Sequence, residues 1–247
     1  MRIFALALAL ILNALPARAG SAHVAAAANF TQAAQDIASA FKAATGHDMV
    51  LSFGASGALY AQITQGAPFE ILLSADQERP AQALAAGLAL GETRFTYAIG
   101  KLVLWSRDGR AEQGEAALRA GGWGKLALAN PASAPYGGAA IETLQSLKLY
   151  DALAPKIVQG ASIAQTFQFV QTGNADLAFV ALSQVIDHPE GGRWLVPQSL
   201  YKPILQDAVL LKTGAANEAA RAFMTFLKGP QARAIIERRG YDAGAAN

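Results

Sequence analysis

The sequence has no cysteine, only three methionines and three histidines, and few charges, since 15% of its 247 residues are Asp, Glu, Lys or Arg. Without cysteine, the chain has no disulfide framework, no thiolate metal site, no cysteine nucleophile and no cysteine-linked lipid anchor. The histidines His23, His47 and His188 are not spaced as metal ligands, and we expect His47 and His188 on exposed loops. The hydrophobic content of 53% is enough to bury a large core.

Long apolar runs are scarce, and the one clear example is at the beginning. After Arg2, residues 3–15 are almost all apolar, which suits the hydrophobic region of a signal peptide and is too short to span a bilayer. Ala17 and Ala19 then fit the small-x-small cleavage rule. We expect residues 1–19 to be a signal peptide removed after Ala19; an uncleaved anchor or a buried N-terminal helix is the alternative. Export without a lipidated cysteine favours a periplasmic location.

An excess of positive or negative charge is also lacking. Removing Arg2 and Arg18 with the signal peptide leaves eighteen basic residues against eighteen acidic ones. A neutral surface without basic runs argues against nucleic-acid binding, which needs a clustered positive field. Neither GxxxxGK[ST] nor GxGxxG occurs, so no nucleotide cofactor is expected.

Short apolar runs alternate with helix-like spacing in two series, which predicts an α/β fold. The first series has strands at 23–28, 49–53 and 69–74 and helices at 31–45, 58–65 and 79–86. The second has strands at 126–129, 156–159 and 176–181 and helices at 139–147 and 162–172, and C-terminal helices are expected at 217–228 and 230–238. Each series predicts a mixed, mostly parallel sheet flanked by helices.

Two long extended runs, 95–106 and 203–211, separate the series and suggest a double crossover between two lobes. We therefore expect residues 20–98 and 203–247 to form the first lobe and residues 99–202 to form a second lobe inserted into it. A ligand would then bind in the cleft between the lobes, at the carboxyl ends of the strands.

Four turns at those strand ends have a composition that suits an anion. They are Ala28-Asn29, Gly54-Ala55-Ser56-Gly57, Ala134-Pro135-Tyr136-Gly137 and Ala161-Ser162-Ile163. Each precedes an expected helix and offers free backbone N–H groups, and none contains Arg or Lys. Neutral donors favour a fully ionised oxyanion, because a protonated one would need an acceptor. The alternative is that Asn29, Ser56 and Ser162 are ordinary helix caps.

Six longer motifs, in order along nearly the whole chain after residue 19, resemble periplasmic molybdate-binding proteins of bacterial ABC importers. They are AAANFTQAAQDIASAFKAATGH, VLSFGASGALYAQITQGAPFEILLSAD, RFTYAIGKLVLWS, LANPASAPYGGAA, DLAFVALSQV and FLKGPQA. The resemblance implies a two-lobed periplasmic binding protein fold of type II that closes on dehydrated molybdate or tungstate. It implies no catalytic residue and no cofactor, with molybdenum entering only as the oxyanion. The implied partners are a membrane permease and its cytoplasmic ATPase, and we expect the binding protein to be a monomer.

The same resemblance implies the ligand-binding residues Asn29, Ser56 and Tyr136, together with the backbone N–H of Ile163. The Tyr136 branch of the family can carry Thr before the Asn, and here Ala28 has no hydroxyl, so that donor is either missing or replaced by a backbone N–H or a water. Ala181 stands where another branch has Tyr. Two other functions stay open: a binding protein of the same fold for another anion such as sulfate, and an exported serine hydrolase using Ser56, for which no histidine base is assignable.

Overall fold

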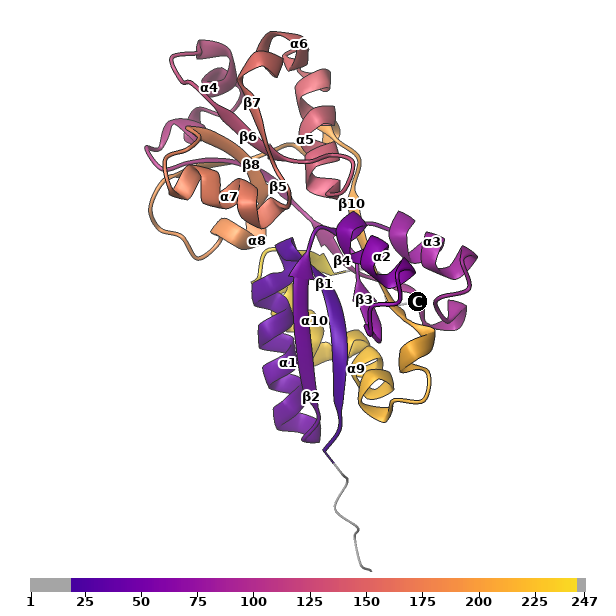
Figure 1. Ribbon diagram of the computed structural model, residues 1–247. Helices are drawn as coiled ribbons and strands as arrows, with labels where there is room; N and C mark the ends of the chain where they lie inside the picture. The colour runs from indigo at the N-terminus through magenta and orange to yellow at the C-terminus, as the bar shows by residue number, and fades with distance from the viewer. Residues whose placement is uncertain (1–18, 244–247) are drawn as a thin grey trace, which may run out of the picture.

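The chain folds into two α/β lobes, one above the other in Figure 1, and the computed structural model describes residues 19–243. The first lobe is built on a six-stranded sheet of order β11-β4-β10-β3-β1-β2, and the second on a five-stranded sheet of order β7-β6-β8-β5-β9. The two-lobed α/β prediction is confirmed. The predicted signal peptide lies outside the described residues, apart from Ala19.

Both ends of the described chain belong to the first lobe. Strands β1 and β2 pair in parallel, as do β1 and β3, whereas the later strands β4, β10 and β11 join the sheet antiparallel. The elements of this lobe are β1 (Ser21–Ala27), the short helix η1 (Ala28–Phe30), α1 (Thr31–Thr45), β2 (Asp48–Gly54), α2 (Ser56–Thr64), β3 (Ile71–Leu73), α3 (Glu78–Ala85), β4 (Phe95–Gly100), β10 (Ile204–Leu210), α9 (Glu218–Lys228), α10 (Pro230–Arg238) and β11 (Asp242–Ala243).

The second lobe repeats the plan on a smaller sheet. Strand β6 pairs in parallel with β7 and β8, and β5 pairs antiparallel with β8 and β9. Its elements are β5 (Leu102–Ser106), α4 (Glu115–Ala120), β6 (Leu126–Ala129), α5 (Pro135–Ser146), α6 (Tyr150–Leu153), β7 (Ile157–Gly160), α7 (Ile163–Gln171), β8 (Leu177–Ala181), α8 (Leu182–Val185) and β9 (Gly192–Leu195).

The apolar spacing of α1 shows why the predicted helix forms. Ile37 and Phe41 lie four residues apart on one face and are both fully buried. Phe41 packs edge-on against Phe223 of α9, with ring centroids 5.3 Å apart. Gly46 ends the helix with φ of 78°, a left-handed conformation that glycine adopts without a steric penalty.

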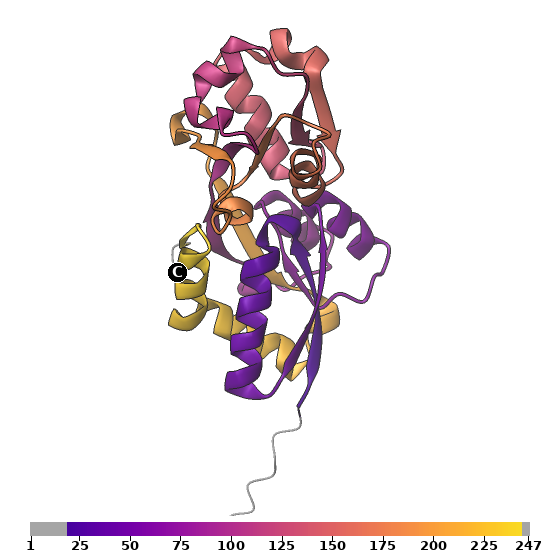
Figure 2. The ribbon, with the colours of Figure 1, turned by 90° about the vertical axis from the view of Figure 1, so that its left-hand side faces the viewer.

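Two crossing segments connect the lobes. The run 95–106, predicted as one extended stretch, is two strands in different sheets: β4 pairs with β10 in the first lobe, and β5 pairs with β8 in the second. The return crossing enters β10, which Figure 2 shows in orange between the lobes. The lobe boundaries at 98/99 and 202/203 stay a prediction, and β4 continues through Gly100.

One buried cluster joins the lobes. It combines Ala28, Ala55 and Ala75 of the first lobe with the second-lobe core around Leu102, Leu128 and Phe179. Small side chains on the first-lobe side let the two backbones approach closely.

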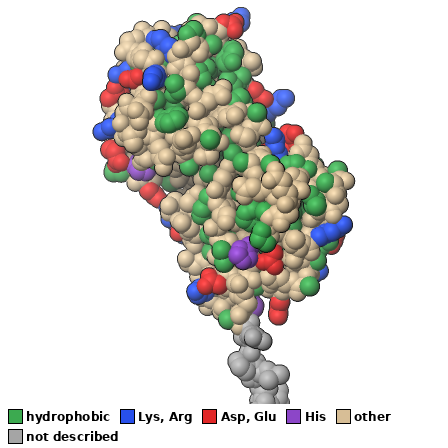
Figure 3. Space-filling model, viewed as in Figure 1, with side chains coloured by type: hydrophobic (Ala, Val, Ile, Leu, Met, Phe, Trp, Pro, Cys, Tyr) green, Lys and Arg blue, Asp and Glu red, His purple; other side chains and the backbone are tan. Residues whose placement is uncertain are grey.

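Charges of both signs are scattered over the face in Figure 3. No helix within residues 19–243 has the length and apolarity needed to cross a membrane.

The start of α5 gives a test of this packing. A Cβ at Gly137 would overlap the carbonyl oxygen of Ala129 and lie 3.0 Å from the nitrogen of Pro131, whereas one at Gly138 would meet nothing within 4 Å. We expect Gly137→Ala to lower the free energy of unfolding by about 1–3 kcal/mol or more, because the backbone must shift. Gly138→Ala, the matched control, should change it by less than about 1 kcal/mol. Urea unfolding of both variants measures this, and equal effects would contradict the packing described.

Candidate functional site

The residues predicted to form the oxyanion site lie where the lobes meet, each at a strand-to-helix turn. Ala28 and Asn29 form η1 after β1, Ser56 begins α2, Tyr136 is in the first turn of α5, and Ile163 begins α7. None is more than 8% exposed. Every predicted turn is followed by a helix, as expected, so helix starts of both lobes face one junction.

Ser56 is 1% exposed, and its hydroxyl has one defined partner. Its Oγ accepts a hydrogen bond from the backbone N–H of Ala75 at 2.9 Å. A hydroxyl carries one proton and accepts through its lone pairs. Because the contact with Ala75 uses a lone pair, the Ser56 proton stays available as a donor.

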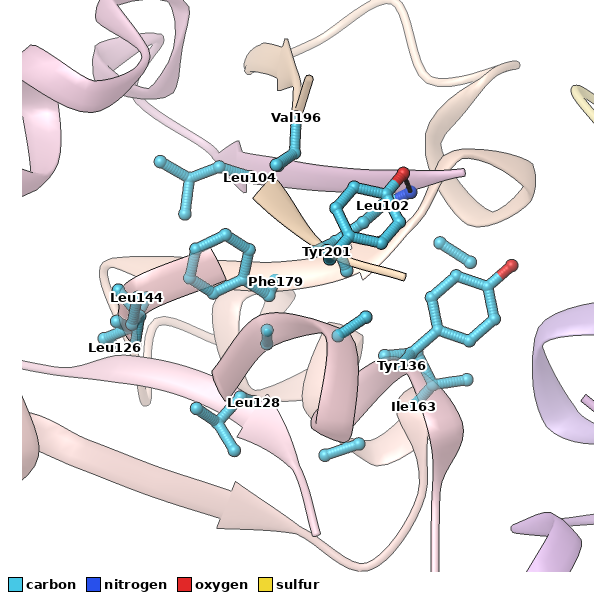
Figure 4. Packing of buried hydrophobic residues seen from close by; sticks show 14 of the residues in the cluster. Leu102, Leu104, Leu126, Leu128, Tyr136, Leu144, Ile163, Phe179, Val196 and Tyr201 are labelled. Carbon is cyan, nitrogen blue, oxygen red and sulfur yellow. Dashed lines mark hydrogen bonds between the residues drawn. The ribbon is translucent and has the colours of Figure 1, made fainter. Parts of the chain in front are cut away.

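Tyr136 has the same arrangement in the second lobe. Its phenol oxygen accepts from Nε2 of Gln206 at 3.3 Å, which again leaves the proton free. In Figure 4 the phenol lies beside Ile163 at one end of the core, with its oxygen pointing away from the other labelled side chains. Burial raises the pKa of Tyr136 well above its ordinary value, with further contributions from the phenols of Tyr241, Tyr97 and Tyr201, so the group is a neutral donor.

The Asn29 side chain is engaged within the protein. Its Nδ2 donates to Oε1 of Gln206 and to the phenol oxygen of Tyr241, both at 3.0 Å. Its carbonyl oxygen accepts from Tyr241 at 2.7 Å and from Ser183 of the second lobe at 2.9 Å. Since both amide protons have partners, the donor that Asn29 can present to a ligand is its backbone N–H.

Ile163 is held by the capping contacts of α7. Oγ of Ser162, the residue before the helix, accepts from the N–H of Gln165 at 3.3 Å. Nε2 of Gln184 donates to the Ile163 carbonyl at 3.1 Å. The alternative role of Ser162 as a helix cap is therefore the one observed, and the N–H of Ile163 is at the helix end, where no intrahelical acceptor exists.

Direct hydrogen bonds join the lobes at several places around the junction. The N–H of Gly57 donates to the Ser133 carbonyl at 2.9 Å, and Nη2 of Arg79 donates to the Ala132 carbonyl at 3.0 Å. Elsewhere, Ser183 reaches Asn29 as described above. The lobes are thus in contact around the predicted residues.

Arginines near the junction are paired with carboxylates. The ion pairs join Arg79 to Asp76 at 3.3 Å and to Glu78 at 2.8 Å, Arg94 to Asp207 at 2.6 Å, and Arg239 to Asp36 at 2.7 Å and also to Asp187 across the lobes. Burial raises the pKa of Asp76, although Arg79 opposes this shift. These cations are therefore neutralised by the protein itself.

Two grooves run along the junction. One of about 400 Å³ is lined by residues that include Asn29, Gln168 and Gln184, and another of about 270 Å³ by residues that include Asp76 and Lys202. Ser56, Tyr136 and Ile163 are buried and line neither groove.

Sequence reasoning missed four residues that support the site: Gln206, Tyr241, Tyr97 and Ser183. All are buried, and they come from β10, the C-terminal segment, β4 and α8. Tyr97 and Ser183 lie within two of the quoted motifs, and Gln206 and Tyr241 lie outside all six, but no motif marks any of the four as a site residue, because each matters through partners far away in the sequence. The expectation for His47 is wrong: it is 7% exposed, and its Nδ1 accepts from the N–H of Gly20 at 2.9 Å.

Within residues 19–243, no group of three or more His, Cys, Asp or Glu side chains is arranged to hold a metal ion. The predicted site residues with polar side chains, Asn29, Ser56 and Tyr136, carry only amide and hydroxyl groups. Two lobes with facing helix starts, joined by two crossing segments, define the class of solute-binding proteins that hold a small ligand between lobes.

The chain belongs to the bacterial extracellular solute-binding protein family, whose model matches residues 22–242. It is 52% identical over 242 residues to the molybdate-binding protein ModA of Rhodobacter capsulatus, covering 98% of this chain and 96% of that one. ModA of Azotobacter vinelandii is 49% identical over 234 residues, covering 93% of each chain. The resemblance to molybdate-binding proteins is thereby confirmed.

Solved structures agree with this assignment. The periplasmic molybdate-binding protein of Azotobacter vinelandii superimposes with a TM-score of 0.87 at 42% identity, covering 91% of this chain and 100% of that chain. The sulfate-binding protein SubI of Mycobacterium tuberculosis matches with a TM-score of 0.76 at 15% identity, covering 91% and 87%, which shows a common fold alone.

The buried phenols predict how stability depends on pH. Burial raises the pKa values of Tyr97, Tyr136 and Tyr241, so above about pH 10 the unfolded chain loses these protons while the folded protein keeps them. The contribution of these phenols to the free energy of unfolding is therefore constant below about pH 10 and falls as the pH rises further. In Tyr136→Phe the fall should be shallower, by up to about 1.4 kcal/mol per pH unit. Urea unfolding at several alkaline pH values measures both slopes, and equal slopes would mean that Tyr136 ionises in the folded protein.

Proposed function

We propose that this protein captures molybdate, and tungstate as a close analogue, with high affinity in the periplasm and delivers it to an ABC importer. The observation that carries the proposal is the pair of buried hydroxyls, one from each lobe, that accept internal hydrogen bonds and keep a free proton: Ser56 and Tyr136. The names of the relatives from Rhodobacter capsulatus and Azotobacter vinelandii support the choice of ligand.

In this proposal the anion is held by neutral donors alone. The hydroxyls of Ser56 and Tyr136 act together with the backbone N–H groups of Ala28, Asn29 and Ile163, which begin helical segments in both lobes. A hydrogen bond to a charged oxygen is worth about 1.5–3 kcal/mol. Four or five of them reach the roughly −8 kcal/mol of a micromolar complex after the costs of association.

Neutral donors also explain a preference for the form of the anion. A dianion without protons can accept at every oxygen, whereas an anion that carries a proton needs an acceptor opposite it. Molybdate and tungstate are nearly the same size and larger than sulfate, so a ring of donors held by packed helix starts can reject sulfate and hardly distinguish the other two.

We also propose how the protein is exported and how it delivers the anion. A signal peptide cut after Ala19 would release residues 20–247 to the periplasm as a monomer, and a permease would read the closed arrangement of the two lobes and pass the anion on with its ATPase. We propose a binding role without catalysis. In the hydrogen bonds of residues 19–243, Ser56 contacts Ala75 and no histidine base, which disfavours a serine hydrolase.

Titration calorimetry of residues 20–247 against molybdate, tungstate, sulfate and phosphate tests the proposal. We expect one-to-one binding of molybdate and tungstate and weak or absent binding of sulfate and phosphate. Ser56→Ala and Tyr136→Phe should each weaken molybdate binding by about 10- to 100-fold, because each removes a donor to a charged oxygen.

Two variants make the same chemical changes elsewhere. Ser106 is fully buried and accepts from the Ala111 N–H at 2.9 Å, as Ser56 does from Ala75. The phenol oxygen of Tyr201 accepts from the N–H of Leu102 at 3.1 Å. Ser106→Ala and Tyr201→Phe should therefore keep wild-type affinity. Folded protein that binds none of the four anions would refute the proposal, and equal losses in the control variants would refute the assignment of Ser56 and Tyr136.

A further inference from the structure

Gln206 lies in β10 at the crossing between the lobes and is fully buried. Its amide contacts residues of three other elements. Oε1 accepts from Nδ2 of Asn29 at 3.0 Å, and Nε2 donates to the phenol oxygen of Tyr136 at 3.3 Å. The Tyr97 phenol lies 3.1 Å from both Oε1 and the Ser74 carbonyl oxygen, so these two acceptors share its single proton. One side chain thus connects Asn29 of the first lobe with Tyr136 of the second.

The direction of the hydrogen bonds from Tyr241 through Asn29 to Gln206 follows from one backbone carbonyl. The Asn29 carbonyl can only accept, so the Tyr241 phenol donates there at 2.7 Å, and Oγ of Ser183 lies within reach of the same proton at 2.9 Å. The Tyr241 oxygen must then accept from Nδ2 of Asn29, and the second Nδ2 proton goes to Oε1 of Gln206. With its oxygen turned toward Asn29, Gln206 presents its N–H to Tyr136.

We propose that Gln206 is a positioning and specificity-determining residue for the bound anion. By donating a hydrogen bond to the phenol oxygen of Tyr136, it uses that oxygen as an acceptor and directs the phenol proton toward the anion. This inference rests on the proposed oxyanion function. The phenol can then donate to an oxyanion and has no lone pair directed at a proton on the ligand. Gln206 thereby favours proton-free dianions over protonated ones such as hydrogen phosphate.

The backbone beside this amide is built to admit it. A Cβ at Gly100 of β4 would overlap the Tyr136 phenol oxygen and lie 2.6 Å from Nε2 of Gln206. The strand passes close to both groups only because residue 100 has no side chain. The register of β10 against β4 also shifts between Gln206 and Asp207, which changes the direction of the strand's side chains at this point.

Replacing the amide by a carboxylate tests the proposal, because a carboxylate cannot donate. In Gln206→Glu the ionised side chain would accept the Tyr136 proton and withdraw it from the anion. Once protonated, it would accept from Asn29 and donate to Tyr136 as the amide does. Molybdate binding to this variant should therefore be coupled to the uptake of one proton, so its affinity rises about tenfold for each pH unit lowered between about pH 8 and about pH 6.

The other titratable groups around this position are the phenols of Tyr97, Tyr136 and Tyr241 and the carboxylates of Asp76 and Asp207. Asp76 is paired with Arg79 at 3.3 Å and is present in the wild type as well, so the wild-type proton count controls for it. Burial keeps the pKa values of the three phenols above this range. Asp207 is paired with Arg94 at 2.6 Å. A proton taken up in this interval therefore reports on the introduced carboxyl group.

Calorimetry in buffers of different ionisation enthalpy counts the protons. We expect none for the wild type, one for Gln206→Glu, and none for Gln198→Glu, the same change at an exposed amide whose Nε2 donates to the Tyr201 carbonyl at 2.9 Å. Weakened binding of Gln206→Glu at every pH without proton uptake would overturn the inference. Wild-type protein that binds no oxyanion would instead overturn the proposed function.

Gln206→Met keeps the test decisive if the carboxylate variant does not fold. Methionine has a similar length and no amide. The Tyr136 phenol therefore loses the hydrogen bond that orients its proton, while the packing is retained. We expect about tenfold weaker molybdate binding, and Gln206→Met combined with Tyr136→Phe should bind as Tyr136→Phe alone does. Losses that simply add would mean that Gln206 does not act through Tyr136, which overturns the inference.

Discussion

The direction of the parallel strands is the constraint on which the whole molecule depends. Because β1, β2 and β3 run the same way, the helical segments that follow β1 and β2 begin at one edge of the first sheet, and β6 and β7 impose the same order on the second. The two crossings then turn these edges toward each other. Backbone N–H groups without intrahelical partners therefore meet at the junction, and no cationic side chain is needed to attract an anion there.

The direction of the hydrogen bonds decides which groups at the junction can donate to a ligand. Ser56 and Tyr136 can act as donors because their oxygens accept hydrogen bonds from the Ala75 N–H and from Nε2 of Gln206. The nearby arginines Arg79 and Arg94 are held in ion pairs. In the proposed function, selectivity for a dianion would follow from the donors presented at the junction and from the size of the ring that they form.

The helices and the turns before them could be predicted from the sequence. Apolar spacing predicted α1 with the observed bounds, and the turns at Asn29, Ser56, Tyr136 and Ile163 are all followed by helices. The run 95–106 was predicted as one stretch because both of its strands are apolar, and only pairing with β10 and β8 divides it. Gln206 and Tyr241 could not be found, because their roles depend on contacts with Asn29, 177 and 212 residues away in the sequence.

The most direct test of the central claim is a crystal structure of residues 20–247 with bound tungstate, whose anomalous scattering locates the anion. The account predicts a tungstate between the lobes, with its oxygens within hydrogen-bond distance of the Ser56 and Tyr136 hydroxyls and of the N–H groups of Asn29 and Ile163. The ion pairs of Arg79 and Arg239 would remain intact. A tungstate bound instead to Arg79, Arg239 or Lys202 would contradict the claim that neutral donors hold the anion.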